Sequence, residues 1–294
     1  SSQSRGLGDV YKRQVLLEKP MATTLADAMD IVNLARDYPA VIQLGMQYRF
    51  KAQYVDALQV VAAECALGLV KTVAMSEYRP PFLDKVDQWN KFNRNSGGTL
   101  IEKCCHYFDL INVVAQSRAR RVYASGGRAV NFLDFEWQGE PSDIDDHAMV
   151  IIHYDNGMRA SFTLNMFCQE LYEELVVVGE RGRLVASEQA SFQPDTPSKA
   201  DLLVEVPEHP AYRGVSVSYP EWIEASGHYG ATFFEHIAFN LQLSGQPVDA
   251  ATPEQALWSL IVASAAQHSM QTGREMYVGA FCEANGIGDF YEGR

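Results

Sequence analysis

The feature that most constrains the fold of this chain is a strand–helix–strand pattern in residues 15–45. Val15–Leu17 is a short apolar run typical of a buried strand. Apolar residues at helical spacing predict a helix over Leu25–Asp37, and Val41–Leu44 is a second short apolar strand. A βαβ unit of this kind belongs to a parallel sheet. Because one unit cannot form a sheet by itself, we expect further strands before it.

The rest of the chain predicts antiparallel hairpins placed between helices. Asn156-Gly157 joins two alternating strands, which is a strong signal for a tight hairpin. Helices are expected over Thr99–Ala115, about 230–244 and 253–271. We therefore predict an α/β (α+β) fold, in which a remnant of a parallel sheet precedes a domain with a large, mainly antiparallel sheet flanked by helices.

Composition and charge exclude several classes of partner. The chain has 24 Lys plus Arg and 37 Asp plus Glu, and therefore a formal net charge of −13. Such an acidic chain is poorly suited to nucleic acid or to an anionic membrane surface, because both attract Lys and Arg. No apolar run reaches the ~20 residues of a membrane-spanning helix. The five cysteines form no CxxC pair, so we expect reduced thiols in a cytoplasmic protein that handles small polar molecules.

The first residues differ in character from everything that follows. Ser1–Gln14 is polar, has no helical or strand periodicity, and resembles translated adapter or vector sequence. We therefore interpret residues 1–14 as a foreign or disordered segment and exclude it from the fold. A native flexible tail is the alternative interpretation.

Lys19 is the first candidate for chemistry. It follows the first predicted strand and precedes Pro20. Ligands of open parallel sheets bind outside the carboxyl ends of the strands. A lysine there can serve as proton donor, proton acceptor or alkoxide stabiliser, although from its position alone a solvated surface lysine is the simpler interpretation.

The helix predicted from Thr99 carries a second set of candidates. Glu102, His106 and Asp109 are spaced at i, i+4 and i+7, which predicts that they share one face. An acid one turn before a histidine can orient the imidazole and set its proton affinity. A surface ion pair and a metal site remain alternatives. We predict no metal, because this helix alone supplies too few ligands for zinc.

Two further segments could face a ligand. The loop over residues 87–95 contains Trp89, Asn93 and Arg94. Amide and guanidinium groups bond hydroxyls and Trp stacks on a sugar face, so this mixture suits a polyhydroxylated ligand, or simply a solvated loop. His228 begins a C-terminal helix and could reach a cleft.

Taken in order, these motifs resemble the Gfo/Idh/MocA family of NAD(P)-dependent dehydrogenases. The matching motifs are Glu18-Lys19-Pro20, Gln47-Tyr48-Arg49-Phe50, the helix pattern of Gly97, Gly98, Glu102, His106 and Asp109, and Thr252-Pro253-Glu254. The resemblance implies hydride transfer between a CH–OH group of a sugar or polyol and NAD or NADP. It also implies a homo-oligomer formed through the open sheet.

The resemblance implies a domain division as well. Residues 15–50 would be the C-terminal remnant of a Rossmann nucleotide-binding domain. Residues 51–280 would be an α/β substrate and oligomerisation domain, and residues 281–294 a C-terminal tail.

The family resemblance assigns roles to individual residues. Lys19 would polarise the reacting hydroxyl, and His106 would take its proton as acid/base. Glu102 would bind a substrate hydroxyl or tune His106. Glu18 and Lys19 would lie near the nicotinamide. The residues expected on the substrate side are Arg49, Trp89, Asn93, Arg94 and His228.

One departure from the family pattern is large. No G-x-G-x-x-G fingerprint follows a strand. We therefore expect an N-terminally truncated enzyme that binds cofactor weakly or not at all. A non-catalytic carbohydrate-binding or oligomerisation module is the alternative. A metal-dependent hydrolase is a third hypothesis, based on the Glu102/His106 pair and the acidic turn at Asp143–His147.

Overall fold

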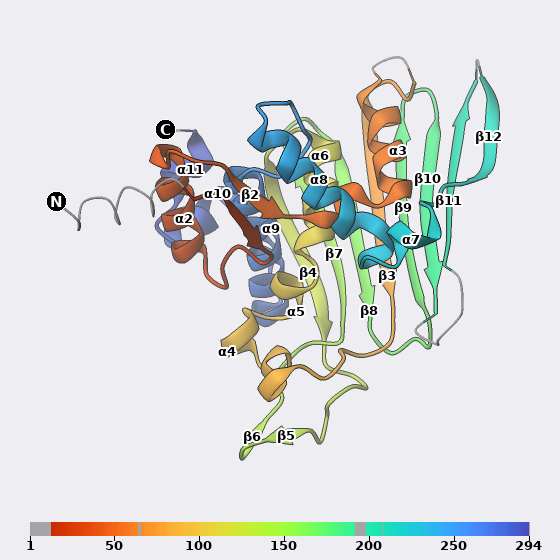
Figure 1. Ribbon diagram of the computed structural model, residues 1–294. Coiled ribbons are helices and arrows are strands. Elements are labelled where there is room, and N and C mark those ends of the chain that lie inside the picture. The colour runs from red at the N-terminus through yellow and green to blue at the C-terminus, as the bar shows by residue number, and fades with distance from the viewer. Residues whose placement is uncertain (1–12, 64–65, 192–197, 208, 294) are drawn as a thin grey trace.

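The computed structural model describes residues 13–63, 66–191, 198–207 and 209–293 (Figure 1). The segment interpreted as foreign lies outside the described residues, except for Arg13 and Gln14. Within the described ranges, no helix combines the length and the apolar character needed to cross a membrane.

The predicted βαβ unit is confirmed. Strands β1 (Val15–Glu18) and β2 (Ile42–Gly45) pair in parallel, and helix α2 (Leu25–Asp37) connects them. The Thr24 hydroxyl oxygen accepts a hydrogen bond from the Asp27 backbone N–H at 3.2 Å, which caps the free amides at the start of α2.

The large sheet is also confirmed, and it has nine strands in the order β12-β11-β10-β9-β3-β8-β7-β4-β13. Neighbouring strands are antiparallel except for the parallel pair β3–β8. A separate ribbon contains β5 (Glu136–Trp137) and β6 (Glu140–Pro141). The strands of the large sheet are β3 (Val70–Tyr78), β4 (Ala119–Gly127), β7 (His147–Tyr154), β8 (Arg159–Asn165), β9 (Leu171–Gly179), β10 (Arg183–Ala190), β11 (Lys199–Val206), β12 (His209–Ser216) and β13 (Met276–Tyr277).

Helices cover one face of this sheet and leave the other open. Helices α3 (Ala52–Ala62), α6 (Cys105–Ala115) and α9 (Pro253–Thr272) pack on it. In β7, Val150 and Ile152 are buried beneath the helices, as strand alternation requires. The remaining helical elements are η1 (Gln47–Phe50), η2 (Val86–Lys91), α4 (Asn93–Ser96), α5 (Thr99–Glu102), α7 (Glu221–Glu224), η3 (His228–Gly230), α8 (Ala231–Leu243), α10 (Val278–Ala284) and α11 (Gly288–Glu292).

The helix predicted over Thr99–Ala115 is interrupted, and this corrects the sequence prediction. α5 ends at Glu102 and α6 begins at Cys105. The backbone carbonyl of Glu102 accepts a hydrogen bond from Lys19 Nζ at 2.8 Å, a partner from the distant strand β1. A tertiary contact thus occupies an acceptor that an uninterrupted helix would use internally.

The C-terminal residues, predicted as a tail, instead form α10 and α11. Cys282 is fully buried, and the Trp258 ring on α9 lies 5.2 Å from Phe290 and 5.8 Å from Tyr291, between ring centroids. These aromatic contacts pack the C-terminal helices α10 and α11 against α9 and so stabilise them. The division of the chain near residue 50 stays a prediction.

Candidate active site

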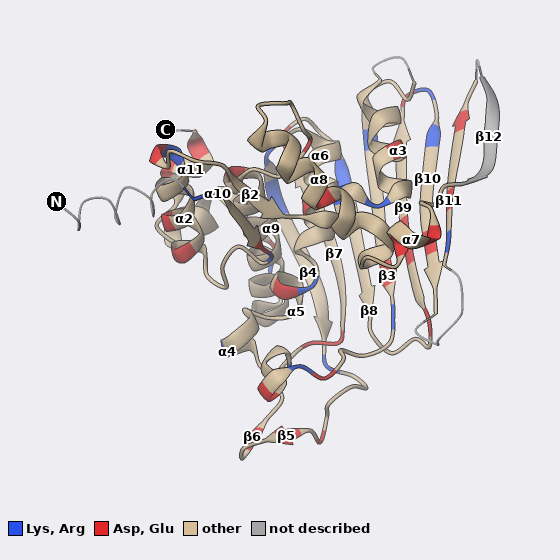
Figure 2. Cartoon of the chain, in the orientation of Figure 1, with Lys and Arg blue, Asp and Glu red and all other residues tan. Residues whose placement is uncertain are grey.

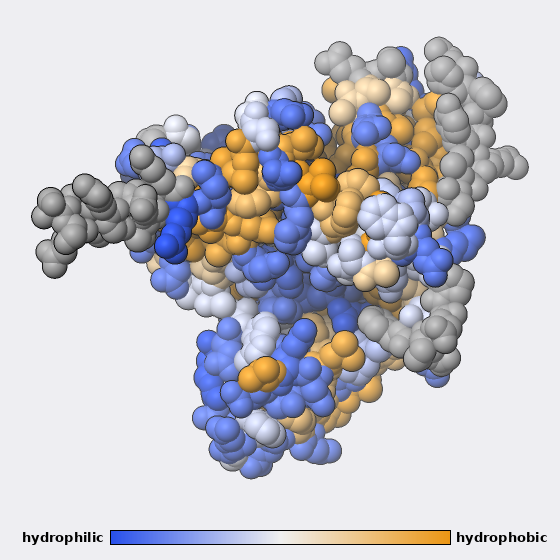
Figure 3. All heavy atoms as spheres, viewed as in Figure 1, coloured by the Kyte–Doolittle hydropathy of each residue, from blue (hydrophilic) through white to orange (hydrophobic). Residues whose placement is uncertain are grey.

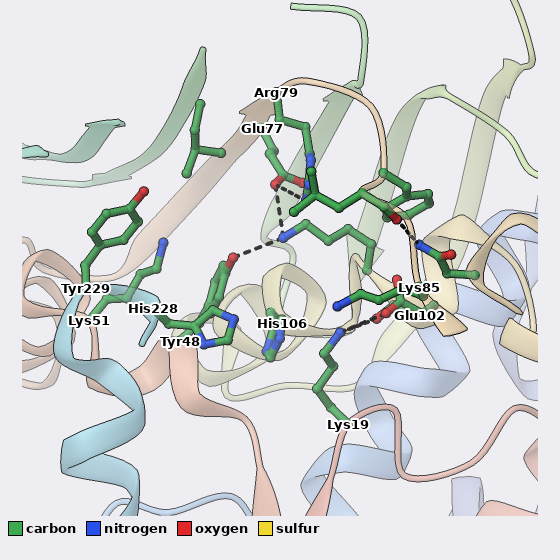
Figure 4. Close-up of a pocket in the computed structure, with 15 residues that line it drawn as sticks. Lys19, Tyr48, Lys51, Glu77, Arg79, Lys85, Glu102, His106, His228 and Tyr229 are labelled. Atoms are coloured by element: carbon green, nitrogen blue, oxygen red, sulfur yellow. Dashed lines mark hydrogen bonds and ion pairs between the residues drawn. The ribbon is translucent and has the colours of Figure 1, made fainter. Parts of the chain in front are cut away.

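A cavity of about 350 Å³ opens beside the carboxyl end of β1. This volume lies within the range of small-molecule sites. Its walls come from β1, η1, the α5–α6 junction, the segment after β3, and η3 (Figure 4). The same region appears as a hydrophilic hollow between the upper part of the molecule and the lobe that contains α4 (Figure 3). Four of the predicted site residues meet there: Lys19, Glu102, His106 and His228.

Lys19 and Glu102 form the ion pair at one side of the cavity. The Lys19 Nζ lies 3.3 Å from Glu102 Oε1 and donates to the Glu102 backbone oxygen. Both side chains are 15% exposed, so they keep access to the cavity. The parallel strand that ends before Lys19 and the break in the motif helix together fix this amine in position.

His106 is buried, with 2% of its surface exposed, and it stacks on Tyr48. The ring centroids lie 4.2 Å apart and the planes differ by 4°. Burial lowers the pKa of His106 well below its ordinary value, and the nearby ammonium groups of Lys19 and Lys103 lower it further. The imidazole is therefore neutral at neutral pH and can accept a proton.

His228 lies at the start of η3, on the far side of Tyr48, and lines the cavity. Partial desolvation lowers its pKa to about 4, with smaller contributions from Lys51 and Lys103. Two neutral imidazoles thus face the same cavity.

Sequence reasoning missed a buried polar network behind Tyr48. Lys51 is 1% exposed, and its Nζ lies 2.6 Å from Glu173 and 2.5 Å from Glu188. Although burial opposes its charge, these two carboxylates raise the pKa of Lys51. The Lys51 Nζ also lies 4.1 Å from the Tyr48 ring centroid, so the network supports the ring on which His106 stacks.

A second missed pair is Glu77 and Lys103. Glu77 is fully buried, and its Oε1 lies 3.0 Å from Lys103 Nζ. Lys103 also donates to the Tyr48 hydroxyl at 3.0 Å. The sequence held a signal for Glu77, because it shares the buried face of β3 with Val73 and Met75. A carboxylate at a strand position where the alternation predicts a buried apolar side chain indicates that the charge is paired or functional.

Comparison with known proteins identifies the family. Residues 63–279 match the Gfo/Idh/MocA model described as the oxidoreductase family, C-terminal alpha/beta domain. The chain belongs to the Gfo/Idh/MocA family of oxidoreductases.

Curated relatives in this family are distant. Over 178 residues, 60% of this chain, it is 24% identical to myo-inositol 2-dehydrogenase of Thermotoga maritima. Over 177 residues, again 60%, it is 25% identical to the uncharacterized oxidoreductase YrbE of Bacillus subtilis. The chain spans about half the length of these two, 49% and 48%, respectively.

A solved structure shares the fold. GenD2 from gentamicin A biosynthesis, in complex with NAD, superposes with a TM-score of 0.68 at 20% identity. The match covers 94% of this chain and 73% of that one.

The Gfo/Idh/MocA motif residue Asp109 does not share the cavity with His106. Asp109 accepts two 2.7 Å hydrogen bonds from the buried guanidinium of Arg49. Arg49 Nη1 also donates to Gln255 on α9 at 3.0 Å. His106 and Asp109 both lie on α6, but Asp109 turns to the buried guanidinium of Arg49 and is absent from the cavity lining.

Four of the five predicted substrate-side residues lie outside the cavity lining: Arg49, which pairs with Asp109, and also Trp89, Asn93 and Arg94. Trp89 is half-buried in η2, and Asn93 bonds the backbone oxygen of Asp143 at 2.8 Å. Arg94 is exposed and pairs with Glu140. The same loop nevertheless contributes Asn90 to the lining, and Lys85, just before the loop, lines the cavity as well.

Glu18, expected near the cofactor, is exposed at the end of β1. Among the described residues, no group of three or more His, Cys, Asp or Glu side chains is arranged to hold a metal ion. In the acidic turn, Asp146 instead accepts hydrogen bonds from the backbone N–H groups of residues 129–131.

Proposed function

We propose that this chain supplies the substrate pocket and the acid–base groups of an NAD- or NADP-dependent dehydrogenase acting on a CH–OH group of a sugar or polyol. The observation that carries the proposal is the buried, neutral His106 beside the Lys19–Glu102 pair, in a cavity at the carboxyl end of a parallel strand. The family and the myo-inositol 2-dehydrogenase relative support the reaction class.

The three residues divide the work of removing a hydroxyl proton. His106 accepts the proton, because desolvation keeps its imidazole uncharged until then. Lys19 donates a hydrogen bond to the substrate oxygen and stabilises the negative charge that develops on it. Glu102 holds Lys19 through its carboxylate and its backbone oxygen, and can bond a neighbouring hydroxyl.

The residues present fit the nicotinamide end of a dinucleotide. Glu18 and Lys19 end β1 at the edge where ligands of parallel sheets bind, directly beside the cavity. A nicotinamide bound there supplies the hydride acceptor for the carbinol carbon. The GenD2 relative was solved with NAD, which supports this class of cofactor.

The test is cofactor reduction by the purified chain with saturating NAD or NADP and a panel of sugars and polyols. We expect reduction by the wild type that falls about 10²–10⁴-fold in His106→Asn. Lys71→Met is the matched control, because Lys71 lies in an exposed pair with Glu180, outside the cavity. Binding of both sugar and NADH, followed by fluorescence titration, without any cofactor reduction would instead support the non-catalytic module.

We also propose that the open face of the sheet mediates homo-oligomerisation. Tyr123 on β4 lies directly opposite Ile151 on β7, and Met149 follows on the same face. Their exposed fractions are 42%, 48% and 66%. Exposed apolar side chains clustered on one sheet face are typical of protein interfaces. We expect Met149→Glu with Ile151→Glu to yield monomers in analytical ultracentrifugation, and a monomeric wild type would refute the proposal.

A further inference from the structure

The charges around the cavity are not balanced. Five basic residues line it, and the carboxylates in contact with them are Glu77, Glu102, Glu173 and Glu188. A surplus of positive charge remains in a protein whose overall charge is −13. It is therefore a local property of this cavity and not a reflection of composition.

The surplus lies on the wall formed by the segment after β3. Elsewhere in the lining, Lys19 is paired with Glu102, and Lys51 contacts two carboxylates. On the β3 side, Glu77 contacts Lys103 at 3.0 Å and Arg79 at 3.6 Å, so two cations face one carboxylate. Figure 2 shows both basic and acidic residues along this segment, and acidic residues on the outer helices α2 and α7.

Lys85 adds another cation to the same wall. Its side chain reaches into the cavity (Figure 4), and it forms no ion pair with any carboxylate in the described part of the chain. The neighbouring Asp84 pairs instead with Lys91, at 2.5 Å. Lys91 is held between the Phe132 and Phe135 rings, 4.8 and 4.4 Å from their centroids. Because Asp84 pairs with Lys91, it does not pair with the neighbouring Lys85. The Lys85 ammonium therefore faces the cavity.

Two apolar residues, together with Asn90, complete this wall. Phe82 and Leu83 line the cavity next to Lys85, and the Arg79 guanidinium lies 5.6 Å from the Phe82 ring centroid. Apolar neighbours reduce the water available to screen the cations, which strengthens their attraction for an anion. Arginine and lysine are also the side chains that bind carboxylate and phosphate best.

We propose that the substrate is a sugar or polyol that carries an anionic group, a carboxylate or a phosphate, and that Lys85, Arg79 and Lys103 bind this group. The reacting hydroxyl would then face His106 across the cavity. The placement of the reacting hydroxyl at His106 rests on the proposed function, whereas the binding of an anionic group does not. Charge selection itself is a property of binding.

The experiment compares the binding of matched ligands by isothermal titration calorimetry: hexoses, the corresponding uronic acids and the hexose 6-phosphates. We expect at least one anionic form to bind about tenfold tighter than its neutral parent, the effect of one charge-assisted hydrogen bond. The preference should weaken with salt. Stronger binding of the acid or of the phosphate identifies which anion is selected.

Three variants locate the effect. Lys85→Gln should reduce the preference about tenfold, Lys85→Arg should retain it, and Lys71→Gln should leave it unchanged. The exposed position of Lys85 makes all of these compatible with folding. Equal binding of neutral and anionic ligands, or a preference unaffected by Lys85→Gln, would overturn the proposal.

The outcomes also separate this inference from the proposed function. Anion-selective binding by a chain that also binds NADH but reduces no cofactor would refute only the dehydrogenase. Cofactor reduction together with equal binding of neutral and anionic substrates would refute only the charge selection.

Discussion

Replacement of Lys51 by methionine tests whether the polar network behind the cavity is held by its central cation. Lys51→Met retains most of the side-chain volume and removes the charge. It leaves Glu173 and Glu188, which are 0% and 2% exposed, facing each other without their shared ammonium. Two buried carboxylates cannot both remain ionised without a partner.

The expected loss of unfolding free energy in Lys51→Met follows from the burial of Glu173 and Glu188. Removing one partner of a buried ion pair destabilises a protein by about 3–5 kcal/mol, because the remaining charge is left uncompensated. Lys71→Met is the control: Lys71 and Glu180 have side-chain exposures of 54% and 47%, and such surface pairs contribute about 0–1 kcal/mol. The two variants delete the same group and differ in its environment.

The assay is urea unfolding followed by circular dichroism, with the free energy of unfolding extrapolated to water. We expect Lys51→Met, combined with Glu173→Gln and Glu188→Gln, to recover part of the loss, because no carboxylate then remains unpaired. A cost for Lys51→Met no larger than that of Lys71→Met would refute the reasoning. It would mean that the two carboxylates take up protons or solvent at little expense.

Four further predictions concern the site and its helices. The acid limb of the turnover pH profile should lie below about 6.5, because burial, Lys19 and Lys103 lower the pKa of His106 and the base is lost only when it protonates. Stability measured by urea titration should also fall below that pH, since the unfolded chain binds this proton more tightly. Gly98→Ala should cost about 1–3 kcal/mol in thermal unfolding, because φ is +109° and a Cβ would overlap the Gln267 amide. Thr252→Ala should cost about 1 kcal/mol in the same assay, because it removes the capping box of α9.

Sequence patterns predicted a helix, strand or turn correctly where the residues that stabilise it are neighbours in the sequence. The apolar run before Glu18 and the Asn156-Gly157 hairpin were both confirmed, because neighbouring residues decide each of them. The same signals failed where a distant partner intervenes. Lys19 donates a hydrogen bond to the Glu102 backbone carbonyl, where α5 ends. Trp258 on α9 packs against Phe290 of the C-terminal segment.

The sequence alone determined the mixed α/β architecture, the motif order and the pocket residues Lys19, Glu102, His106 and His228. Periodicity and motif spacing depend only on the order of residues along the chain, so the sequence is sufficient to predict them. Only the tertiary structure decided that Asp109 pairs with Arg49 and that Tyr48 stacks on His106. It also decided that Lys85 faces the cavity with no ion pair to a carboxylate of the described residues. These contacts join residues from different elements, and their partners are set by how the helices pack on the sheet. Charge balance in a cavity is therefore a property of the fold and not of composition.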